Sequence, residues 1–440
     1  MRSRFLYLGL VALLALVAAG CGGGSDGGSA GGTTGGGGNE SVTGSISLMG
    51  IWVGTEQASI QAVLDGFMAE YPNVDVKYNA AGDNIVTVLA TAVQGGNPPD
   101  LATIAQPGTI NEYAQAGELQ PIDFAADTIA ANFSQSIVDL GTFDGKLYSF
   151  LFKGANKSTV WYNVPVFEDA GVEAPATWDE LLTAAGTLKA SGVPAYSIGG
   201  ADGWTLTDLF ENIYLRTAGE EMYDKLATHE IPWTDQSVKD ALAEMAKIFG
   251  DTDNIAGGTQ GALQTDFPTS VTQVFADPPK AAMVIEADFV AGEIVNSTTA
   301  EPETGFNEFD FPSINGSAPA VVGGGDQVVM FKDSPAAQAL VEYLASPEAS
   351  DIWVKLGGFS SPNKNVDVNA YPDAILKATA SALAEAESFR FDLSDLQPSE
   401  FGGTVGQGLF KLFQDFLANP SDVDGIAQKM EDAAAKAYGG

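Results

Sequence analysis

Histidine and cysteine are almost missing from this sequence. Its 440 residues include one histidine, His229, and one cysteine, Cys21. A single histidine leaves no room for the usual Ser-His pairs or for metal sites built from several histidines. A single cysteine excludes an internal disulfide, so the folded body must be held together by its apolar core. We therefore expect no catalytic residues, no metal and no cofactor.

Basic residues are also few. Lysine and arginine together number 20 against 57 aspartates and glutamates, which gives a formal net charge of −37. Contacts with phosphate groups would be repulsive, so we expect no nucleic-acid partner and no attraction to anionic lipid. The acidic residues are spread along the whole chain. This distribution is typical of solubility or of adaptation to salty water, and binding of a cationic ligand is a third explanation.

Long apolar runs are limited to one segment near the N-terminus. It extends from Phe5 to Ala19, which is shorter than the roughly 20 residues of a transmembrane helix. Arg2 and Arg4 precede it and small residues end it, so residues 1–20 are predicted to be a secretory signal peptide. Because no second run of this kind follows, we do not expect the chain to span a membrane.

Cys21 stands directly after this segment, and the junction resembles the lipobox of bacterial lipoproteins. The resemblance implies cleavage before Cys21 and a lipid on its sulfur, although Ala18 stands where the usual leucine would be. Residues 21–43 are rich in glycine and serine, cannot bury apolar surface and predict a disordered tether. We expect an extracytoplasmic protein anchored to the cell membrane through Cys21.

The next part of the chain alternates between strand and helix patterns. Residues 45–52, 74–78 and 100–104 predict buried strands, while residues 60–71 and 85–93 have apolar residues at helical spacing. This βαβαβ order predicts a parallel sheet with helices on both faces. About 400 residues exceed what one hydrophobic core usually covers, so two α/β lobes are expected.

Later segments predict further elements. Asp144-Gly145 predicts a hairpin with a type I′ turn. Helices are expected at residues 178–190, 206–215, 235–249, 336–344 and 347–356 and from residue 374 onward, and strands at residues 282–285, 309–312 and 320–322.

Short segments spread over residues 45–440 also share a characteristic order and spacing. The early ones are Trp52 with Glu56 and residues 67–72, 96–100, 112–119, 121–123, 143–148 and 161–163. Together they resemble solute-binding proteins of carbohydrate ABC transporters, of the family 1 type. Later segments are similar to the α-glucoside-binding members, at residues 200–208, 216–219, 229–232, 277–279, 323–326 and 357–365.

The resemblance implies the type II periplasmic-binding-protein fold, in which two α/β lobes are joined by three hinge crossings and enclose a cleft. Matching segments place the crossings near residues 150–153, 311–317 and 358–362. One lobe is then residues 44–152 plus 312–358, and the other is residues 153–311 plus 359–440. The resemblance further implies a monomeric, non-enzymatic receptor that binds a carbohydrate, an α-glucoside by its similarity, and delivers it to ABC permease subunits by cleft closure.

Candidate ligand-binding residues combine flat rings with hydroxyl-binding groups, as a neutral sugar requires. Trp52 and Trp204 stand beside turns that contain glycine, and Trp204 resembles the stacking position of the family. Phe289 matches an aromatic position of the family, and Phe359 at the third crossing could close over a sugar. Gly324 and Gly325 would let the backbone approach a ligand. Polar side chains at strand ends or helix starts are expected to face the crevice, and they are Glu56, Gln106, Asp202, Asp208, Glu286 and Asp326.

Two other functions stay open from the residues alone. A secreted acidic glycoside hydrolase needs only a pair of carboxylates, and acids are abundant here. A polyamine- or peptide-binding receptor of the same fold would fit the acidic charge. Turnover of an aryl-glucoside would indicate the hydrolase, and binding of a polyamine without binding of any sugar would indicate the second alternative.

Overall fold

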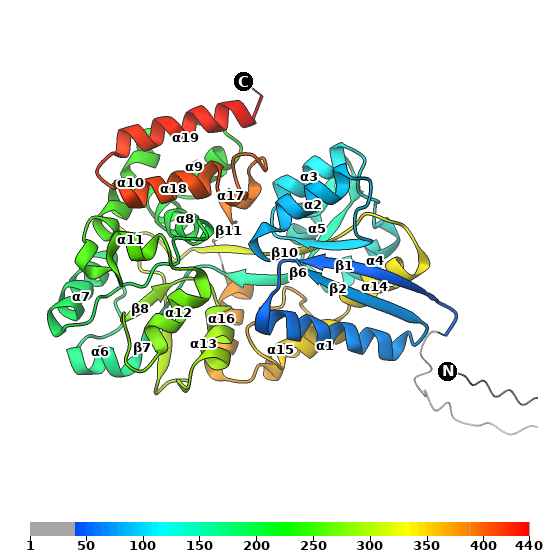
Figure 1. Ribbon diagram of the computed structural model, residues 1–440, viewed down its shortest axis with the longest axis horizontal. Coiled ribbons are helices and arrows are strands. Elements are labelled where there is room, and N and C mark those ends of the chain that lie inside the picture. The colour runs from blue at the N-terminus through cyan, green and yellow to red at the C-terminus, as the bar shows by residue number, and fades with distance from the viewer. Residues whose placement is uncertain (1–39, 387, 440) are drawn as a thin grey trace, which may run out of the picture. The chain divides into compact units, whose positions relative to one another are not determined.

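A computed structural model of the protein describes residues 40–386 and 388–439 (Figure 1). The predicted signal peptide at residues 1–20, the lipidation site at Cys21 and almost all of the tether lie outside the described residues. Within the described part, no helix offers the continuous apolar length that a bilayer crossing requires. The lipid anchor therefore stays a prediction.

The first lobe is built on the parallel sheet that the apolar spacing predicts. Its strands β1 (Gly44–Gly50), β2 (Val74–Ala80) and β3 (Leu101–Ile104) alternate along the chain with helices α1 (Gly54–Glu70) and α2 (Ile85–Gln94). β1 lies between the other two strands and pairs with both in parallel. The predicted βαβαβ unit is confirmed, and it brings the carboxyl ends of the three strands to one edge of the sheet.

Strands from later in the chain extend this sheet. β10 (Val321–Met330) pairs antiparallel to β3 and to β6 (Ser149–Asn156), and β11 (Phe389–Phe391) pairs in parallel with β10. The resulting order is β11-β10-β3-β1-β2, with β6 also on β10. β10 belongs to both lobes, because Val322 is buried in the core of the second lobe and Val328 in that of the first.

Helices close the core of the first lobe. α14 (Pro335–Leu344) packs against β1, and α15 (Pro347–Val354) packs against α1. Leu340 and Trp353 of these helices are fully buried with Phe67 of α1. The lobe also contains α3 (Pro107–Gln115), α4 (Ala126–Asn132), α5 (Gln135–Leu140) and 3₁₀ turns at Gly82–Asn84 and Asp123–Ala125.

The predicted hairpin lies at the edge of this lobe. Its strands β4 (Thr142–Phe143) and β5 (Lys146–Leu147) pair antiparallel. Asp144 and Gly145 have φ values of 48° and 74°, which are the left-handed values that a type I′ turn requires at both positions. The predicted turn is confirmed.

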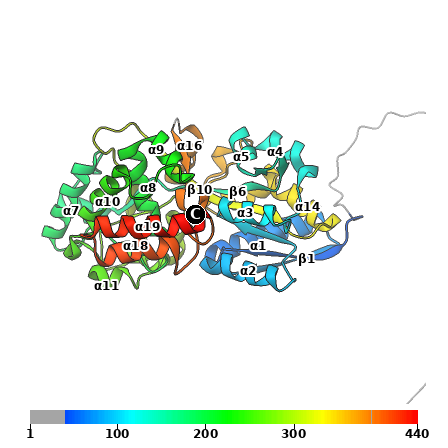
Figure 2. The same cartoon turned by 90° about the horizontal axis from the view of Figure 1, so that it is seen from above.

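The second lobe surrounds a small antiparallel sheet with helices. β7 (Thr159–Asn163) lies between β8 (Met283–Ile285) and β9 (Phe306–Asp310). α8 (Trp204–Ala218) is its central helix, because every residue from Thr205 to Leu215 is buried. Figure 2 shows α18 and α19 side by side on this lobe.

The other helices of the second lobe surround α8 and the small sheet. They are α6 (Val164–Ala170), α7 (Trp178–Ser191), α9 (Glu220–Ala227), α10 (Gln236–Phe249), α11 (Gly258–Ala262), α12 (Phe267–Phe275), α13 (Val290–Ser297), α16 (Ala374–Glu385), α17 (Leu393–Leu396), α18 (Gly408–Ala418) and α19 (Val423–Ala437), with a 3₁₀ turn at Thr252–Asn254. A further 3₁₀ turn at Val368–Ala370 precedes α16.

Packing moves two of the predicted lobe boundaries. Phe311 and Ile314 are buried in the core of the second lobe, so the second crossing lies inside β10 and not at residues 311–317. Phe359 is buried in the core of the first lobe, and Lys364 donates hydrogen bonds to carbonyl groups of that lobe. Residues 359–371 therefore pack with the first lobe. Both crossings are set by contacts between distant segments, which local apolar spacing does not reveal.

Candidate functional site

A cleft of about 590 Å³ lies between the lobes. Such a volume is within the roughly 300–1,000 Å³ of small-molecule sites. The first lobe contributes the starts of α1 and α2, the end of β3 and the end of α15. The second lobe contributes the starts of α8 and α12, helix α13 and the segment around α17. Strands β6 and β10 complete it where they pass between the lobes.

Three rings form an aromatic wall on the second lobe. Trp204 is the first residue of α8, Phe267 is the first residue of α12, and Phe289 is the N-cap of α13. Their ring centroids lie 5.3 Å (Trp204–Phe267), 5.9 Å (Trp204–Phe289) and 5.2 Å (Phe267–Phe289) apart. All three are partly exposed and border the cleft. The wall therefore offers packed ring surface to a ligand while its backbone is fixed by three helix starts.

Trp52 and Trp353 border the opposite side of the cleft. Each is 1% exposed, and their rings meet edge to face with centroids 5.0 Å apart. The Trp52 indole Nε1 donates a hydrogen bond of 2.7 Å to Asp326 Oδ2 on β10. These two tryptophans consequently act mainly as core residues that show one edge to the cavity.

Lys153 of β6 stands between the two lobes. Its Nζ lies 2.5 Å from Glu56 Oε1 of the first lobe and 5.0 Å from the centroid of the Phe289 ring of the second. Burial lowers the pKa of Lys153, but the negative charges of Glu56 and Asp326 raise it by more, so the ammonium stays charged. The pair places one positive and one negative group on the same part of the cleft.

The cleft floor, formed by Gln106, Lys157, Asp392 and Asp395, is a dense ionic cluster. Lys157 Nζ lies 2.5 Å from Asp392 Oδ2 and 3.0 Å from Asp208 Oδ1. Burial raises the pKa of Asp392, yet the Lys157 ammonium lowers it further, to about 2. Asp392 is therefore the ionised partner of this lysine.

Gln106 and Asp395 connect the lobes across the cleft floor. Gln106 Nε2, just after β3, donates a hydrogen bond of 3.0 Å to Asp395 Oδ1 of α17. Gln106 borders the cavity, and its Oε1 is buried without a hydrogen-bond partner in the part of the chain that the structure describes. Burial, with the nearby Asp392 charge, raises the pKa of Asp395 to about 7. This part of the floor presents acceptors to whatever occupies the cleft.

Asp202 positions the aromatic wall. Its Oδ2 accepts a hydrogen bond of 2.6 Å from the backbone N–H of Phe267, so it fixes the start of α12 beside that of α8. Burial raises the pKa of Asp202 to about 6, and the charges of Asp83 and Asp266 raise it in the same direction. Asp83 belongs to the first lobe, so acidic groups face one another across the cleft.

Eight of the predicted ligand-binding residues border the cleft. They are Trp52, Glu56, Gln106, Asp202, Trp204, Phe289, Gly325 and Asp326.

Four predicted residues do not reach the cleft. Asp208 and Glu286 are each 2% exposed and lie beneath the floor, where they contact each other. A Cβ on Gly324 would lie 2.7 Å from Lys157 Cε, so this position faces a side chain. Phe359 stacks on Trp353 with centroids 5.0 Å apart and is 2% exposed, so it is a core residue and does not cover the cavity.

Asp208 and Glu286 form a buried pair of acids. Asp208 Oδ2 and Glu286 Oε1 accept no hydrogen bond from the described residues. Burial raises the pKa of Glu286 to about 8 and that of Asp208 well above its ordinary value. A proton held between the two carboxyl groups satisfies both oxygens.

Sequence reasoning missed several residues of the cleft. Lys153, Lys157, Phe267, Asp392 and Asp395 border it and were not predicted. Two lysines in the stretch at residues 149–160, which has no other charged residue, were a usable signal, because a buried lysine needs a paired acid. Asp392 and Asp395 gave no such signal, since their partners lie far away in the chain.

The carboxylates of Asp208, Glu211 and Asp392 are close enough to hold a metal ion, with oxygens within 4.8 Å of one another. Lys157 already contacts two of these groups. Glu211 accepts hydrogen bonds from two backbone N–H groups of α17, at 2.8 and 2.9 Å. These contacts use oxygens that a cation would need, and the expected absence of a metal stays a prediction.

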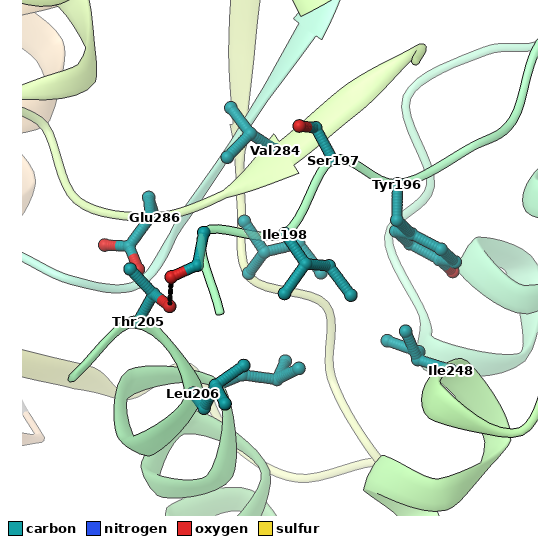
Figure 3. A pocket seen from close by; sticks show the side chains of 11 residues that line it. Tyr196, Ser197, Ile198, Thr205, Leu206, Ile248, Val284 and Glu286 are labelled. Atoms are coloured by element: carbon teal, nitrogen blue, oxygen red, sulfur yellow. Dashed lines mark hydrogen bonds between the residues drawn. The ribbon is translucent and has the colours of Figure 1, made fainter. Parts of the chain in front are cut away.

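A second cavity, of about 20 Å³, lies under the strand that leads to Glu286 (Figure 3). Tyr196, Ile198, Leu206 and Ile248 surround it, and Thr205 Oγ1 donates a hydrogen bond of 2.8 Å to the Gly199 carbonyl at its side. Its volume suits about one water molecule and no larger ligand.

Known proteins are similar to this chain over most of its length. Residues 52–351 match the family described as bacterial extracellular solute-binding protein. An osmoprotective compounds-binding protein (GgtB) of Synechocystis sp. is 34% identical over 373 residues, which cover 83% of this chain and 86% of the relative. The alpha-glucosides-binding periplasmic protein (AglE) of Rhizobium meliloti is 34% identical over 396 residues, which cover 86% and 85%.

The fold is shared with solved receptors. The bacterial solute receptor AcbH, described as preferring β-D-galactopyranose exclusively, superimposes with a TM-score of 0.78 over 90% of this chain and 99% of its own, at 20% identity. Likeness at that identity shows the fold alone, and the predicted two-lobed type II fold is confirmed. The family match and the two relatives carry the further conclusion: this chain belongs to the family of bacterial extracellular solute-binding proteins.

Proposed function

We propose that the protein is an extracytoplasmic sugar receptor of an ABC transporter, which binds an oligosaccharide between its lobes. The observation that carries this proposal is the aromatic wall of Trp204, Phe267 and Phe289 facing carboxylates and Gln106 across one cavity. Aromatic faces pack on the C–H side of a sugar ring, while carboxylate and amide oxygens accept hydrogen bonds from its hydroxyls. An α-glucoside is the proposed ligand, supported by the similarity to an alpha-glucosides-binding protein.

Delivery to the permease follows from closure of the lobes. A ligand can favour the closed state only through contacts that are better there. Trp204 and Phe289 lie on one lobe and Glu56 and Gln106 on the other, so a sugar that contacts both sets gains the second set only when the lobes approach. The closed receptor then docks as a monomer on permease subunits. A lipid on Cys21 would keep the protein beside them.

A binding role without catalysis agrees with the family, whose members are binding proteins. The hydrolase alternative is not favoured by the family match, and two acids of the cleft, Glu56 and Asp392, are engaged by lysines. A polyamine-binding receptor would use the same cavity for a different ligand. Direct binding measurements with sugars and with a polyamine distinguish it from a sugar receptor.

Isothermal titration of the purified protein with maltose, trehalose and sucrose tests the proposal, with spermidine as the competing probe. We expect saturable one-site binding of at least one of the sugars. Binding of spermidine without binding of any mono-, di- or oligosaccharide would contradict it. Incubation with an aryl-glucoside should release no product.

A further inference from the structure

We propose that the cleft selects its ligand by charge, so that an amino-substituted oligosaccharide binds more tightly than its neutral parent and an anionic sugar is rejected. This inference rests on the proposed function and assigns Asp395, with Gln106, as the specificity-determining pair on the cleft floor.

Negative groups dominate the lining of the cleft. Acidic side chains outnumber basic ones by eight to two among the residues that border it. Helices α1, α2, α8 and α12 begin at the cleft, and each helix start carries roughly half a positive charge. Together these charges offset about two of the excess carboxylates. The field at the centre of the cavity is therefore negative, even with the backbone counted.

Both lysines of the cleft are already paired. Lys153 Nζ is 2.5 Å from Glu56, and Lys157 Nζ is 2.5 Å from Asp392 and 3.0 Å from Asp208. To bind a carboxylate or phosphate of a ligand, Lys157 would have to leave the buried acids Asp208 and Asp392, and Lys153 would have to leave Glu56, whose side chain is partly exposed. Leaving a buried charge without its partner is strongly unfavourable. The lysines thus cancel acids of the protein and are not free to bind an anion.

The neutral hydrogen-bond donors near the floor likewise already donate to acidic side chains of the protein. Trp52 Nε1 donates to Asp326 at 2.7 Å, and Gln106 Nε2 donates to Asp395 at 3.0 Å. Gln106 Oε1 has no hydrogen-bond partner among the described residues, although the residue is only 7% exposed. The floor thus holds a buried acceptor, on a residue that borders the cleft, that no donor of the described chain satisfies. A sugar hydroxyl supplies one donor, and an ammonium supplies three.

The aromatic wall suits a cation as well as a sugar ring. Trp204, Phe267 and Phe289 expose ring surface to the cleft, and aromatic faces attract ammonium groups. Lys153 and Lys157 already use this attraction, with Nζ 5.0 Å from the Phe289 centroid and 5.8 Å from that of Trp204. In a ligand that carries an amino group on a sugar ring, the ring can therefore pack on the aromatic wall and the ammonium can be attracted by the aromatic faces and by the acidic lining.

Titration calorimetry with three matched classes of sugar, neutral, amino-substituted and carboxylated, tests the inference. The probes are maltose and trehalose, their 6-amino-6-deoxy derivatives substituted on either ring, and the corresponding 6-carboxylates. Replacing a neutral hydrogen bond by a charge-assisted one should tighten binding of one amino derivative by about tenfold at low salt. High salt should reduce that gain. The carboxylates should bind at least about tenfold more weakly than the parent.

Asp395→Asn tests the assigned pair. Asparagine keeps an oxygen that accepts from Gln106 but removes the charge, so the preference for the amino derivative over its parent should fall toward one. Asp75→Asn, at an exposed position on β2, is the control and should keep the preference. Circular dichroism and thermal unfolding establish that each variant is folded.

The outcomes separate this inference from the proposed function. The charge selection alone would be overturned if the neutral sugars bind and their carboxylates bind equally tightly. It would also be overturned if the amino derivatives bind no more tightly than the neutral sugars at low salt. An Asp395→Asn protein with an unchanged preference would remove Asp395 from the assignment. Absence of binding by every sugar, neutral or charged, would overturn the proposed function and this inference with it.

Discussion

Gln106 of the first lobe donates a hydrogen bond of 3.0 Å to Asp395 of the second lobe, at the floor of the cleft. The same surfaces meet again nearby, where the Glu112 carboxylate accepts from the backbone N–H of Ser399 at 2.8 Å and from its hydroxyl at 2.7 Å. Helix α3 with the preceding Gln106, and α17 with the following Ser399, therefore form a contact between the lobes that is separate from the crossing strands. This contact fixes how closely the lobes approach on one side of the cavity.

A substitution at Gly108 tests whether this contact between the lobes influences ligand binding. A Cβ on Gly108 would lie 2.0 Å from the carbonyl oxygen of Gln397, so Gly108→Ala must push the two surfaces apart. We expect sugar affinity to fall by about tenfold or more, because a loss of about 1.4 kcal/mol in closure has that effect. Gly186→Ala is the control, since a Cβ there meets no atom within 4 Å. Equal affinities of the two variants in calorimetry would show that this contact does not influence binding.

Trp204→Ala should weaken sugar binding by roughly ten- to a hundredfold, because the ligand loses both apolar contact and a stacking surface. Trp204 is partly exposed, so the melting temperature of the ligand-free protein should change little. Trp178 is 2% exposed in the core of the second lobe and provides the contrast. Trp178→Ala should cost about 3–5 kcal/mol in the free energy of unfolding. An undiminished sugar response in Trp204→Ala would exclude this ring from the site.

Removal of Lys157 should destabilise the protein strongly. Lys157→Met leaves Asp208 and Asp392 buried without their cation, and breaking a buried pair in this way costs about 3–5 kcal/mol. Lys225→Met breaks an exposed pair with Glu221 and should change the free energy of unfolding very little. Urea unfolding measures both. Adding Asp392→Asn to Lys157→Met should restore part of the loss, and no restoration would contradict this account of the cluster.

The buried acids predict that stability falls as pH rises. Burial raises the pKa of Glu286 to about 8 and that of Asp395 to about 7, above their values of about 4.5 and 3.8 in an unfolded chain. A group of this kind binds its proton more tightly in the folded state, so its stabilisation is present at low pH and is lost as pH rises through the folded pKa. The ligand-free protein should therefore melt at a higher temperature at pH 5 than at pH 8.

Glu286→Gln isolates the contribution of one carboxyl group to this pH dependence of the melting temperature. Glutamine cannot ionise, so the decrease in melting temperature between pH 5 and pH 8 should be smaller in this variant. Asp392, whose pKa Lys157 lowers to about 2, stabilises the folded state fully at pH 5 and above and loses that contribution only at lower pH, so it does not affect this comparison. A wild-type melting temperature that increases from pH 5 to pH 8 would contradict the assignment.

Local patterns predicted the first lobe well. The strands and helices from β1 to β3 follow apolar spacing within short windows, and the Asp144-Gly145 turn depends on two adjacent residues. Trp204 was predictable for a similar reason, because a ring at a helix start beside glycines is unusual for a core position. These features need no knowledge of distant parts of the chain.

Features that depend on distant contacts were not predictable. Lys157 and Asp392 are 235 residues apart, and only the folded chain brings them together. Asp208 and Glu286 were predicted to bind ligand because they are acids near a helix start and at a strand end. In the folded chain both are buried beneath the cleft floor. Phe359 was expected to face the ligand, but Trp353 and Phe152 pack against its ring. Which face of a residue is buried depends on packing partners that the sequence does not reveal.

Small-angle X-ray scattering with and without sugar tests the central claim most directly. A receptor whose ligand binds between Trp204 of one lobe and Gln106 of the other must become more compact as the lobes close. We predict a smaller radius of gyration in saturating α-glucoside than in buffer, with no such change for Trp204→Ala at the same sugar concentration. An identical scattering curve in buffer and in saturating ligand, with binding confirmed by calorimetry on the same sample, would contradict delivery by cleft closure.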